Sequence, residues 1–210
     1  MSFLPIRRAV IAAAAAALAV ATFAGPALAD AARDGLISRA VGYLDGVNDV
    51  KARFVQSNAR GEVAEGTVYL ARPGRARFEY DAPAGLLITS DGKTVAIYNT
   101  RLKSVQRVSL ASTPLAVFLA EHIRLDRGAH VTRVDHQPDG FSITARNDRS
   151  PAGGEITLFF DDHPLRLAGW TIVDAQARVT RVSLGPLTPF TPTAAFFSQG
   201  PPPPGGVTRW

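Results

Sequence analysis

The sequence predicts a mainly β (α+β) fold, built on an antiparallel sheet of about eleven strands that is closed or nearly closed. Short segments in which apolar and polar residues alternate fill most of the chain. Gly and Pro residues fall in nearly every gap between these segments, where they mark turns. Helical signals are confined to one segment near the start and one short segment in the middle.

Residues 1–29 have the pattern of a secretory signal peptide. Arg7 and Arg8 form a basic start, residues 9–24 are apolar, and Ala27-Leu28-Ala29 is a small-residue cleavage site. The apolar run is shorter than the ~20 residues that cross a bilayer, so a transmembrane anchor is the weaker alternative. No cysteine follows the cleavage site, so the processed chain would not itself be lipid-anchored. We therefore expect cleavage after Ala29 and export of a soluble product.

The composition of the remaining chain favours one domain held by a hydrophobic core. Without residues 1–29 the chain keeps 21 basic against 18 acidic residues, a net charge of +3. This mild, dispersed charge argues against a nucleic-acid-binding protein. The absence of cysteine excludes a disulfide framework.

The predicted domain covers residues 30–198, and a Pro/Gly-rich tail follows over residues 199–210. Its run of prolines favours extended or unstructured chain. Trp210 leaves a docking segment as the alternative.

The first element after the signal is an amphipathic helix over residues 30–47, where apolar residues recur at spacings of three and four. Asn48-Asp49 is expected to end it. Strands then dominate, and the alternation places them at residues 51–58, 65–71, 75–80, 86–90, 94–99, 104–110, 130–136, 141–147, 155–161, 165–174 and 178–184.

A short helix is expected between the sixth and seventh strands. Ser112-Thr113-Pro114 combines N-cap residues with a proline at the first helical position. The helix should continue to Leu119 or Glu121.

The stretch from residue 72 to residue 83 is the most informative part of the chain. Pro73-Gly74 predicts a turn. In the strand that follows, Phe78 and Tyr80 share an apolar face, and the opposite face is charged. Ser90-Asp91-Gly92-Lys93 then makes a second reversal, which is typical of a hairpin.

This block, R-P-G-R-x-R-F-E-Y-D-x-P followed by L-I-T-S-D-G-K, resembles the periplasmic outer-membrane lipoprotein carrier family, LolA. The resemblance includes Phe54-Val55-Gln56 and residues 66–70 upstream and residues 112–115 downstream, and it covers nearly all of the chain after the signal. It implies an incomplete antiparallel β-barrel covered by a lid of short α-helices. The barrel would enclose a hydrophobic space for the acyl chains of a lipoprotein.

The resemblance also implies a site. In the family, the arginine before the proline of this turn holds the lid closed through hydrogen bonds to the helices and their loops, and that position is Arg72 here. The alternative is a surface arginine at a strand end. The cavity lining implied by the inward-facing apolar residues is Phe54, Val68, Leu70, Phe78, Tyr80, Leu87, Ile97, Leu115, Phe118, Ile143, Leu158, Phe160, Trp170 and Ile172. The pattern alone leaves open whether side chains fill this interior or a ligand enters it.

No catalytic motif is present, so we expect no enzyme, no cofactor and no metal site. The four histidines have no metal-ligand spacing. Asp161-Asp162-His163 could hold a metal, but a solvated turn is favoured.

The function implied by the resemblance is that of a periplasmic chaperone that carries lipoproteins from the inner to the outer membrane. Its partners would be acylated lipoproteins, an inner-membrane lipoprotein-releasing ABC transporter and, where one exists, a LolB-like outer-membrane acceptor, with no nucleic acid. The carrier would be a monomer. Two alternatives remain open: a ligand-sensing regulator on the same scaffold, resembling RseB, and a carrier of another lipid.

Overall fold

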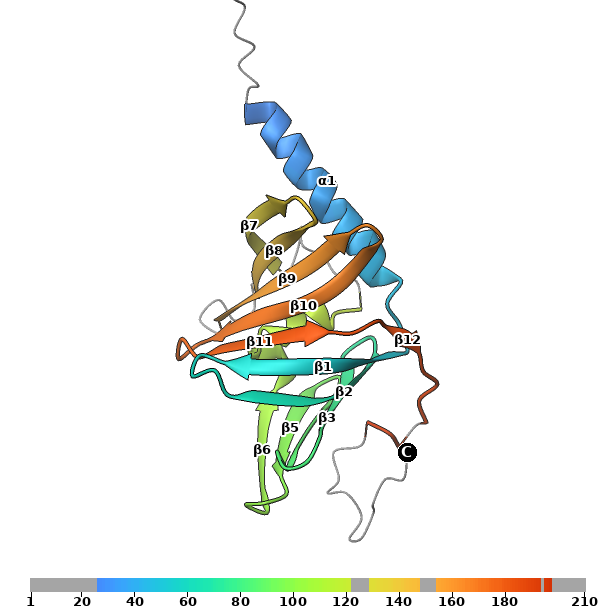
Figure 1. Ribbon diagram of the computed structural model, residues 1–210, viewed down its shortest axis with the longest axis vertical. Helices are drawn as coiled ribbons and strands as arrows, with labels where there is room; N and C mark the ends of the chain where they lie inside the picture. The colour runs from blue at the N-terminus through green and yellow to red at the C-terminus, as the bar shows by residue number, and fades with distance from the viewer. Residues whose placement is uncertain (1–25, 122–128, 148–153, 194, 198–210) are drawn as a thin grey trace, which may run out of the picture.

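A computed structural model describes residues 26–121, 129–147, 154–193 and 195–197. Their strands form a single antiparallel sheet (Figure 1). The strands are β1 (Val50–Asn58), β2 (Val63–Ala71), β3 (Arg75–Tyr80), β4 (Leu86–Asp91), β5 (Thr94–Asn99), β6 (Ser104–Ser109), β7 (Ala129–Gln137), β8 (Gly140–Asn147), β9 (Gly154–Asp162), β10 (Leu165–Asp174), β11 (Val179–Leu184) and β12 (Thr188–Pro189).

The order across the sheet is β6-β5-β4-β3-β2-β1-β11-β10-β9-β8-β7, and the short β12 pairs with β1. Each neighbouring pair is antiparallel. All neighbours on this path except β1 and β11 are consecutive in the chain, as hairpin connections require. Strands β6 and β7 lie at the two ends of this order, and in the described part of the chain they do not pair with each other. The curled sheet is therefore not closed. The predicted incomplete barrel of about eleven strands is thus confirmed.

Three predicted strands, β3, β5 and β10, have the expected bounds, and the other predicted strands differ by one or two residues at an end. The sequence had not predicted β12, which lies in a proline-rich stretch and contributes only two residues to the sheet. Because proline cannot donate to a strand ladder, such a stretch carries a weak strand signal.

Helix α1 runs from Pro26 to Asp45, not over residues 30–47 as expected. It begins at a proline, which is favoured at the first position of a helix. At its other end, Gly46 and Val47 form tighter turns onto the carbonyls of Tyr43 and Leu44. Asn48 caps the end, because its Nδ2 donates to Asp45 O at 3.0 Å.

Helix α2 is short, from Leu115 to Phe118, and a 3-10 turn over Leu110–Ser112 precedes it. The predicted hydroxyl cap is wrong. Thr113 Oγ1 donates back to Leu110 O at 2.8 Å, so its hydroxyl serves the 3-10 turn and not α2. Pro114 is already helical in backbone conformation and precedes α2 without a side-chain cap.

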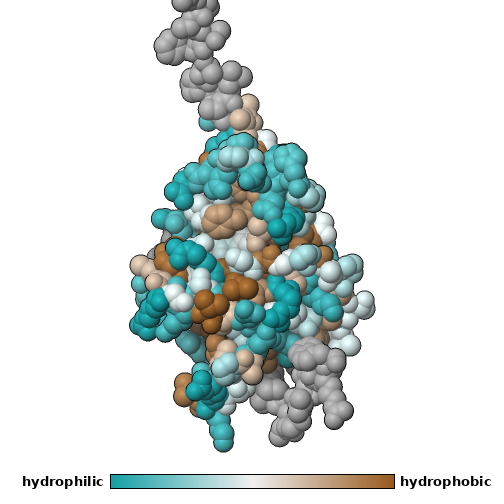
Figure 2. Space-filling model, viewed as in Figure 1, coloured by the Kyte–Doolittle hydropathy of each residue, from teal (hydrophilic) through white to brown (hydrophobic). Residues whose placement is uncertain are grey.

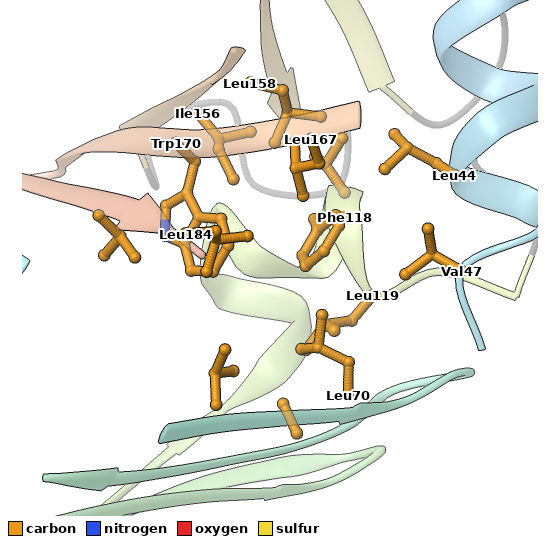
Figure 3. Packing of buried hydrophobic residues seen from close by; sticks show 14 of the residues in the cluster. Leu44, Val47, Leu70, Phe118, Leu119, Ile156, Leu158, Leu167, Trp170 and Leu184 are labelled. Carbon is orange, nitrogen blue, oxygen red and sulfur yellow. The ribbon is translucent and has the colours of Figure 1, made fainter. Parts of the chain in front are cut away.

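One large hydrophobic core lies on the concave face of the sheet. Its alternation follows the cross-strand register, in which Val68 pairs with Phe78 and Phe78 pairs with Ile88. The helices cover this core, and Figure 3 shows Leu44 of α1 and Phe118 of α2 pointing toward the side chains of the sheet.

The molecular surface seen in Figure 2 is mostly hydrophilic, with separate hydrophobic patches among the polar atoms. Val55 and Val63 are among the exposed apolar residues of the chain. Among the described residues, no helix combines the length and the apolar character needed to span a bilayer.

Candidate functional site

Arg72 follows directly after β2, and its side chain is only 2% exposed. Its guanidinium reaches two separate parts of the lid. Toward α1, Nη1 donates to the carbonyl of Leu44, and Nη2 lies 3.4 Å from Asp45 Oδ1. Toward the segment after α2, Nε and Nη2 donate to Ala120 O at 3.2 and 2.8 Å. One planar fork therefore joins both helical segments to the sheet.

Burial lowers the pKa of Arg72, and the hydrogen bond and charge of Asp45 partly oppose this. The guanidinium stays protonated at any pH at which a protein folds. The buried charge is satisfied mainly by backbone carbonyls at the ends of helical segments, where the helix dipole favours a cation. These acceptors do not titrate.

The turn after Arg72 adds a backbone contact to the same segment, because Gly74 N donates to Leu119 O at 2.7 Å. Glycine is required here for two reasons. Its φ is +72°, and a Cβ would lie 2.5 Å from Gly92 Cα. Ser90 Oγ fixes the turn from β4 by donating to Gly74 O at 2.6 Å.

An aromatic cluster lies beneath the lid. The ring of Phe118 packs against Trp170 of β10, with 5.6 Å between their centroids. Trp170 contacts Phe78 edge to face at 6.2 Å, and Phe78 contacts Phe54 at 5.8 Å. Figure 3 shows Phe118 and Leu119 lying between β10 and the strand that carries Leu70. In this state lid side chains occupy the space between helix and sheet.

Tyr80 brings a polar atom to the margin of this cluster. Its ring packs edge to face on Phe54 at 5.1 Å, and its hydroxyl donates to Gln56 Oε1 at 2.7 Å. Burial raises the pKa of Tyr80 to about 12, although its hydrogen bond with Gln56 acts in the opposite direction. The phenol is therefore neutral at physiological pH.

The structure brings all but one of the predicted lining residues into the one large core. Nine are buried in it: Phe54, Val68, Leu70, Phe78, Phe118, Ile143, Leu158, Phe160 and Trp170. Four are partly buried and pack against it: Tyr80, Ile97, Leu115 and Ile172.

Leu87 is the exception, and its inclusion in the lining is corrected. It pairs with Glu79 of β3 and Tyr98 of β5, which lie on the convex face of the sheet. Its neighbour Ile88 pairs with Phe78 and packs against the large core instead. Because alternate residues of a strand face opposite sides, Leu87 cannot share the interior with Phe78.

The Asp161-Asp162-His163 turn has a structural role that the sequence did not predict. Asp162 pairs with Arg39 of α1 through both carboxylate oxygens. Arg39 also lies over the ring of Phe141, 5.7 Å from its centroid. Over the described ranges no cluster of three His, Cys, Asp or Glu could hold a metal.

Comparison with known proteins identifies the family of this chain. A model of the outer membrane lipoprotein carrier protein LolA family matches residues 45–199. An outer-membrane lipoprotein carrier protein of Xanthomonas campestris is 32% identical over 177 residues, which cover 80% of this chain and 82% of that protein. Its counterpart in Chromobacterium violaceum is 34% identical over 131 residues, so the match spans only 61% of that relative's length.

A solved structure, that of a LolA superfamily protein from Nitrosomonas europaea, covers 77% of this chain at 11% identity with a TM-score of 0.45. This likeness is too loose to place individual residues. The family match and the relatives agree, and the chain belongs to the outer-membrane lipoprotein carrier (LolA) family, a family of carriers and not of enzymes.

Proposed function

We propose that this protein is a periplasmic chaperone that shields the acyl chains of lipoproteins inside its barrel and carries them from the inner to the outer membrane. The observation that carries the proposal is the position of Arg72, whose fork holds both lid segments over an aromatic interior. A closed lid over apolar side chains encloses an interior in which a ligand can take the place of the lid side chains.

The physical need for shielding is large. A triacylated lipoprotein exposes roughly 40 to 50 methylenes, and each costs about 0.8 kcal/mol in water. The inward-facing residues of the barrel and of α2 offer aliphatic and aromatic surface to such chains: Phe54, Val68, Leu70, Phe78, Tyr80, Ile97, Leu115, Phe118, Ile143, Leu158, Phe160, Trp170 and Ile172. Release stays possible only if the empty carrier has a competing favourable state.

The closed lid is that competing state. The charge-assisted hydrogen bonds of Arg72 contribute roughly 1.5–3 kcal/mol in all to the closed form. For cargo to enter, Phe118 must leave Trp170, and the carbonyls of Leu44 and Ala120 must separate from the guanidinium. On delivery these contacts form again and help to expel the acyl chains.

Membership of the family supports a role for the protein between two membranes. An inner-membrane lipoprotein-releasing ABC transporter would load it, and the outer membrane, with or without a LolB-like acceptor, would receive the cargo. Cleavage of the signal peptide after Ala29 would release the carrier into the periplasm. Because one barrel encloses its own interior, the carrier needs no second copy and would act as a monomer.

The decisive experiment is transfer of a loaded lipoprotein to acceptor membranes by Arg72→Leu protein. Loss of the closed-state bonds should favour the loaded form by about tenfold to a hundredfold. Loading should persist while onward transfer slows, so that cargo-bound carrier accumulates. Unchanged transfer together with unchanged cargo affinity would sink the proposed role of Arg72.

A fatty-acid probe separates the cargo classes. The probe should enter the barrel and be displaced by a triacylated lipoprotein. Displacement by diacyl lipids alone, with lipoprotein unable to compete, would favour a carrier of another lipid.

A further inference from the structure

The turn between β5 and β6 holds an apolar side chain in water. Figure 1 shows this turn at the lower end of the described strands. Leu102 lies in it and is 75% exposed, the largest exposed fraction among the large hydrophobic residues of the described chain. Every residue from 100 to 107 is exposed, and Val105 of β6 is 42% exposed. Neither Leu102 nor Val105 belongs to a core cluster, so folding gains little from either.

Hydrogen bonds fix the backbone that carries Leu102. The amide of Leu102 donates to Asn99 Oδ1 at 2.9 Å, which ties the turn to the end of β5. Thr100 N donates to Gly85 O at 2.8 Å, and Thr100 Oγ1 donates to the same carbonyl at 3.1 Å. These bonds tie the turn to the connection between β3 and β4. Leu102 is therefore presented on a supported turn and not on a loose loop.

The charged side chains of this hairpin are all cations. Arg101 and Lys103 flank Leu102, and Arg107 follows Val105 on the same face of β6. The sequence has no Asp or Glu between Asp91 and Glu121. None of the three cations forms an ion pair with a carboxylate of the described residues. The hairpin therefore combines an exposed apolar tip with uncompensated positive charge.

The acidic residue in the neighbouring connection does not neutralise this charge. Asp81 precedes the turn between β3 and β4, and its carboxylate lies 2.5 Å from Arg53 Nη2 of β1. That pair is satisfied within the sheet. An anionic partner for the hairpin must come from outside the described chain.

We propose that the β5–β6 hairpin is a membrane-docking site, in which Leu102 enters the interfacial layer of a bilayer and Arg101, Lys103 and Arg107 bind anionic lipid headgroups. The inference deepens the proposed function, on which it rests, because a carrier that exchanges acyl chains with a membrane has to approach its surface. Apolar burial and cation attraction act together at such a surface. One leucine and three cations give a weak attachment, and a carrier that leaves again needs a weak one.

The shape of the hairpin favours a membrane over a protein partner. A stable protein interface buries about 800 Å² on each side and surrounds an apolar centre with a polar rim. Here residues 104–107 are exposed on both faces of β6, so the hairpin is a narrow ribbon with one leucine at its end. An apolar tip flanked by cations matches the boundary between headgroups and acyl chains of an anionic bilayer.

The chain contains a matched control in the turn between β1 and β2. Val63 is 64% exposed there, but Glu62 precedes it and Glu65 follows two residues later. An anionic surface repels carboxylates. The two turns thus present similar apolar side chains in opposite charge environments, and only that of Leu102 should bind anionic vesicles.

The test uses the exported, processed protein without cargo and measures its binding to sedimented vesicles. The parent should bind vesicles that contain phosphatidylglycerol at least about tenfold more tightly than vesicles of phosphatidylcholine alone. Leu102→Ser should weaken this binding about tenfold, and Arg101→Gln about fivefold. Val63→Ser should leave it unchanged, and urea denaturation checks that each variant is folded. Equal binding of the parent to both vesicle types, or equal losses in Leu102→Ser and Val63→Ser, would overturn the proposal and would leave an acidic protein as the partner of these cations.

Leu102→Trp supplies a direct readout of depth. Its added indole emission should shift to shorter wavelength on phosphatidylglycerol vesicles, relative to the parent, and an unshifted emission would place the tip in water and overturn the proposal. Lipoprotein transfer separates this inference from the proposed function. If the parent carries lipoprotein but does not bind anionic vesicles, the docking site fails and the proposed function stands. If Leu102-dependent binding is found in a protein that takes up no lipoprotein, the docking site stands and the proposed function fails.

Discussion

Two of the arginines that join α1 to the barrel, Arg39 and Arg72, do so in opposite physical settings. Arg39 has a side chain that is 46% exposed, and it pairs with the carboxylate of Asp162 at the end of β9. Arg72 is 2% exposed, and its main partners are the carbonyls of Leu44 and Ala120. The first contact is an ion pair near the surface, and the second is a buried guanidinium that donates to uncharged backbone carbonyls.

Under the proposed function, this difference separates a contact that attaches α1 to the barrel from a contact that controls the lid. An exposed pair gains little because water and salt screen its charges. A buried guanidinium that loses its acceptors leaves both sides without hydrogen bonds, so its contacts form or break together. Under the proposed function, Arg39 can hold α1 against β9 in every state, whereas Arg72 distinguishes a closed lid from an open one.

The largest effect is expected from Arg72→Leu. The substitution leaves the carbonyls of Leu44 and Ala120 without their donor, and it should lower the free energy of unfolding by roughly 2–4 kcal/mol. Urea denaturation measures this loss. The amide of Gly74, which donates to Leu119 O, should also exchange hydrogen faster. If exchange at Gly74 is unchanged, Arg72 stabilises the fold without closing the lid.

Arg72→Lys should recover only part of this loss. An ammonium group on a flexible stem keeps the charge but cannot present a planar fork to Leu44 and Ala120 at once. Its free energy of unfolding should fall between those of the parent and of Arg72→Leu. Asp45→Asn is the matched control, because the Asp45 carboxylate is 3.4 Å from Nη2 and is the weaker partner. Full rescue by lysine would mean that charge alone matters at this position.

The strands could be predicted closely because their signal is local. Side chains alternate along each strand, so a few neighbouring residues reveal both the strand and its faces. The error at Leu87 has the same origin. Leu86, Leu87 and Ile88 are all apolar, so the sequence gives no alternation there, and only the pairing of Ile88 with Phe78 shows which residue points inward.

The contacts of Arg72 could not be read from local pattern. Its acceptors lie 28 and 48 residues away, at Leu44 and Ala120, and they are carbonyls that every residue possesses. Only the family resemblance indicated this residue. The stacking of Arg75 and Arg77 on Phe197 and Phe196 was likewise not predicted, although all four residues are visible in the sequence. Their separation of more than a hundred residues hides the contact.

Arg39→Ala should have a much smaller effect than either change at Arg72. The Arg39 side of the ion pair is exposed, although the Asp162 side chain is only 14% exposed, so the contribution of the pair should shrink further in 1 M salt, where the screening length is about 3 Å. Unfolding in low and high salt tests this, with Asp162→Asn as the variant that removes the charge but keeps the contact of Arg39 with Phe141. If Arg39→Ala lowers the free energy of unfolding by a large amount in 1 M salt as well, Arg39 holds α1 as firmly as Arg72 does, and the contrast between the two arginines fails.

The smallest expected effect is a difference in acid sensitivity between the two contacts. The hydrogen bond from Arg39 is the main cause that lowers the pKa of Asp162 below its usual value of 3.8. A carboxylate whose pKa is lower in the folded state stabilises the fold above its unfolded pKa, and this contribution is lost as the pH falls through the lower, folded value. The difference in stability between the parent and Arg39→Ala should therefore be constant above about pH 5 and should disappear below the folded pKa. The difference between the parent and Arg72→Leu should persist over the same range, since the carbonyls of Leu44 and Ala120 do not titrate. Acid titration of urea stability for the three proteins measures both differences. Parallel loss of the two at low pH would show that a carboxylate, and not the carbonyls, is the acceptor on which the lid contact of Arg72 depends.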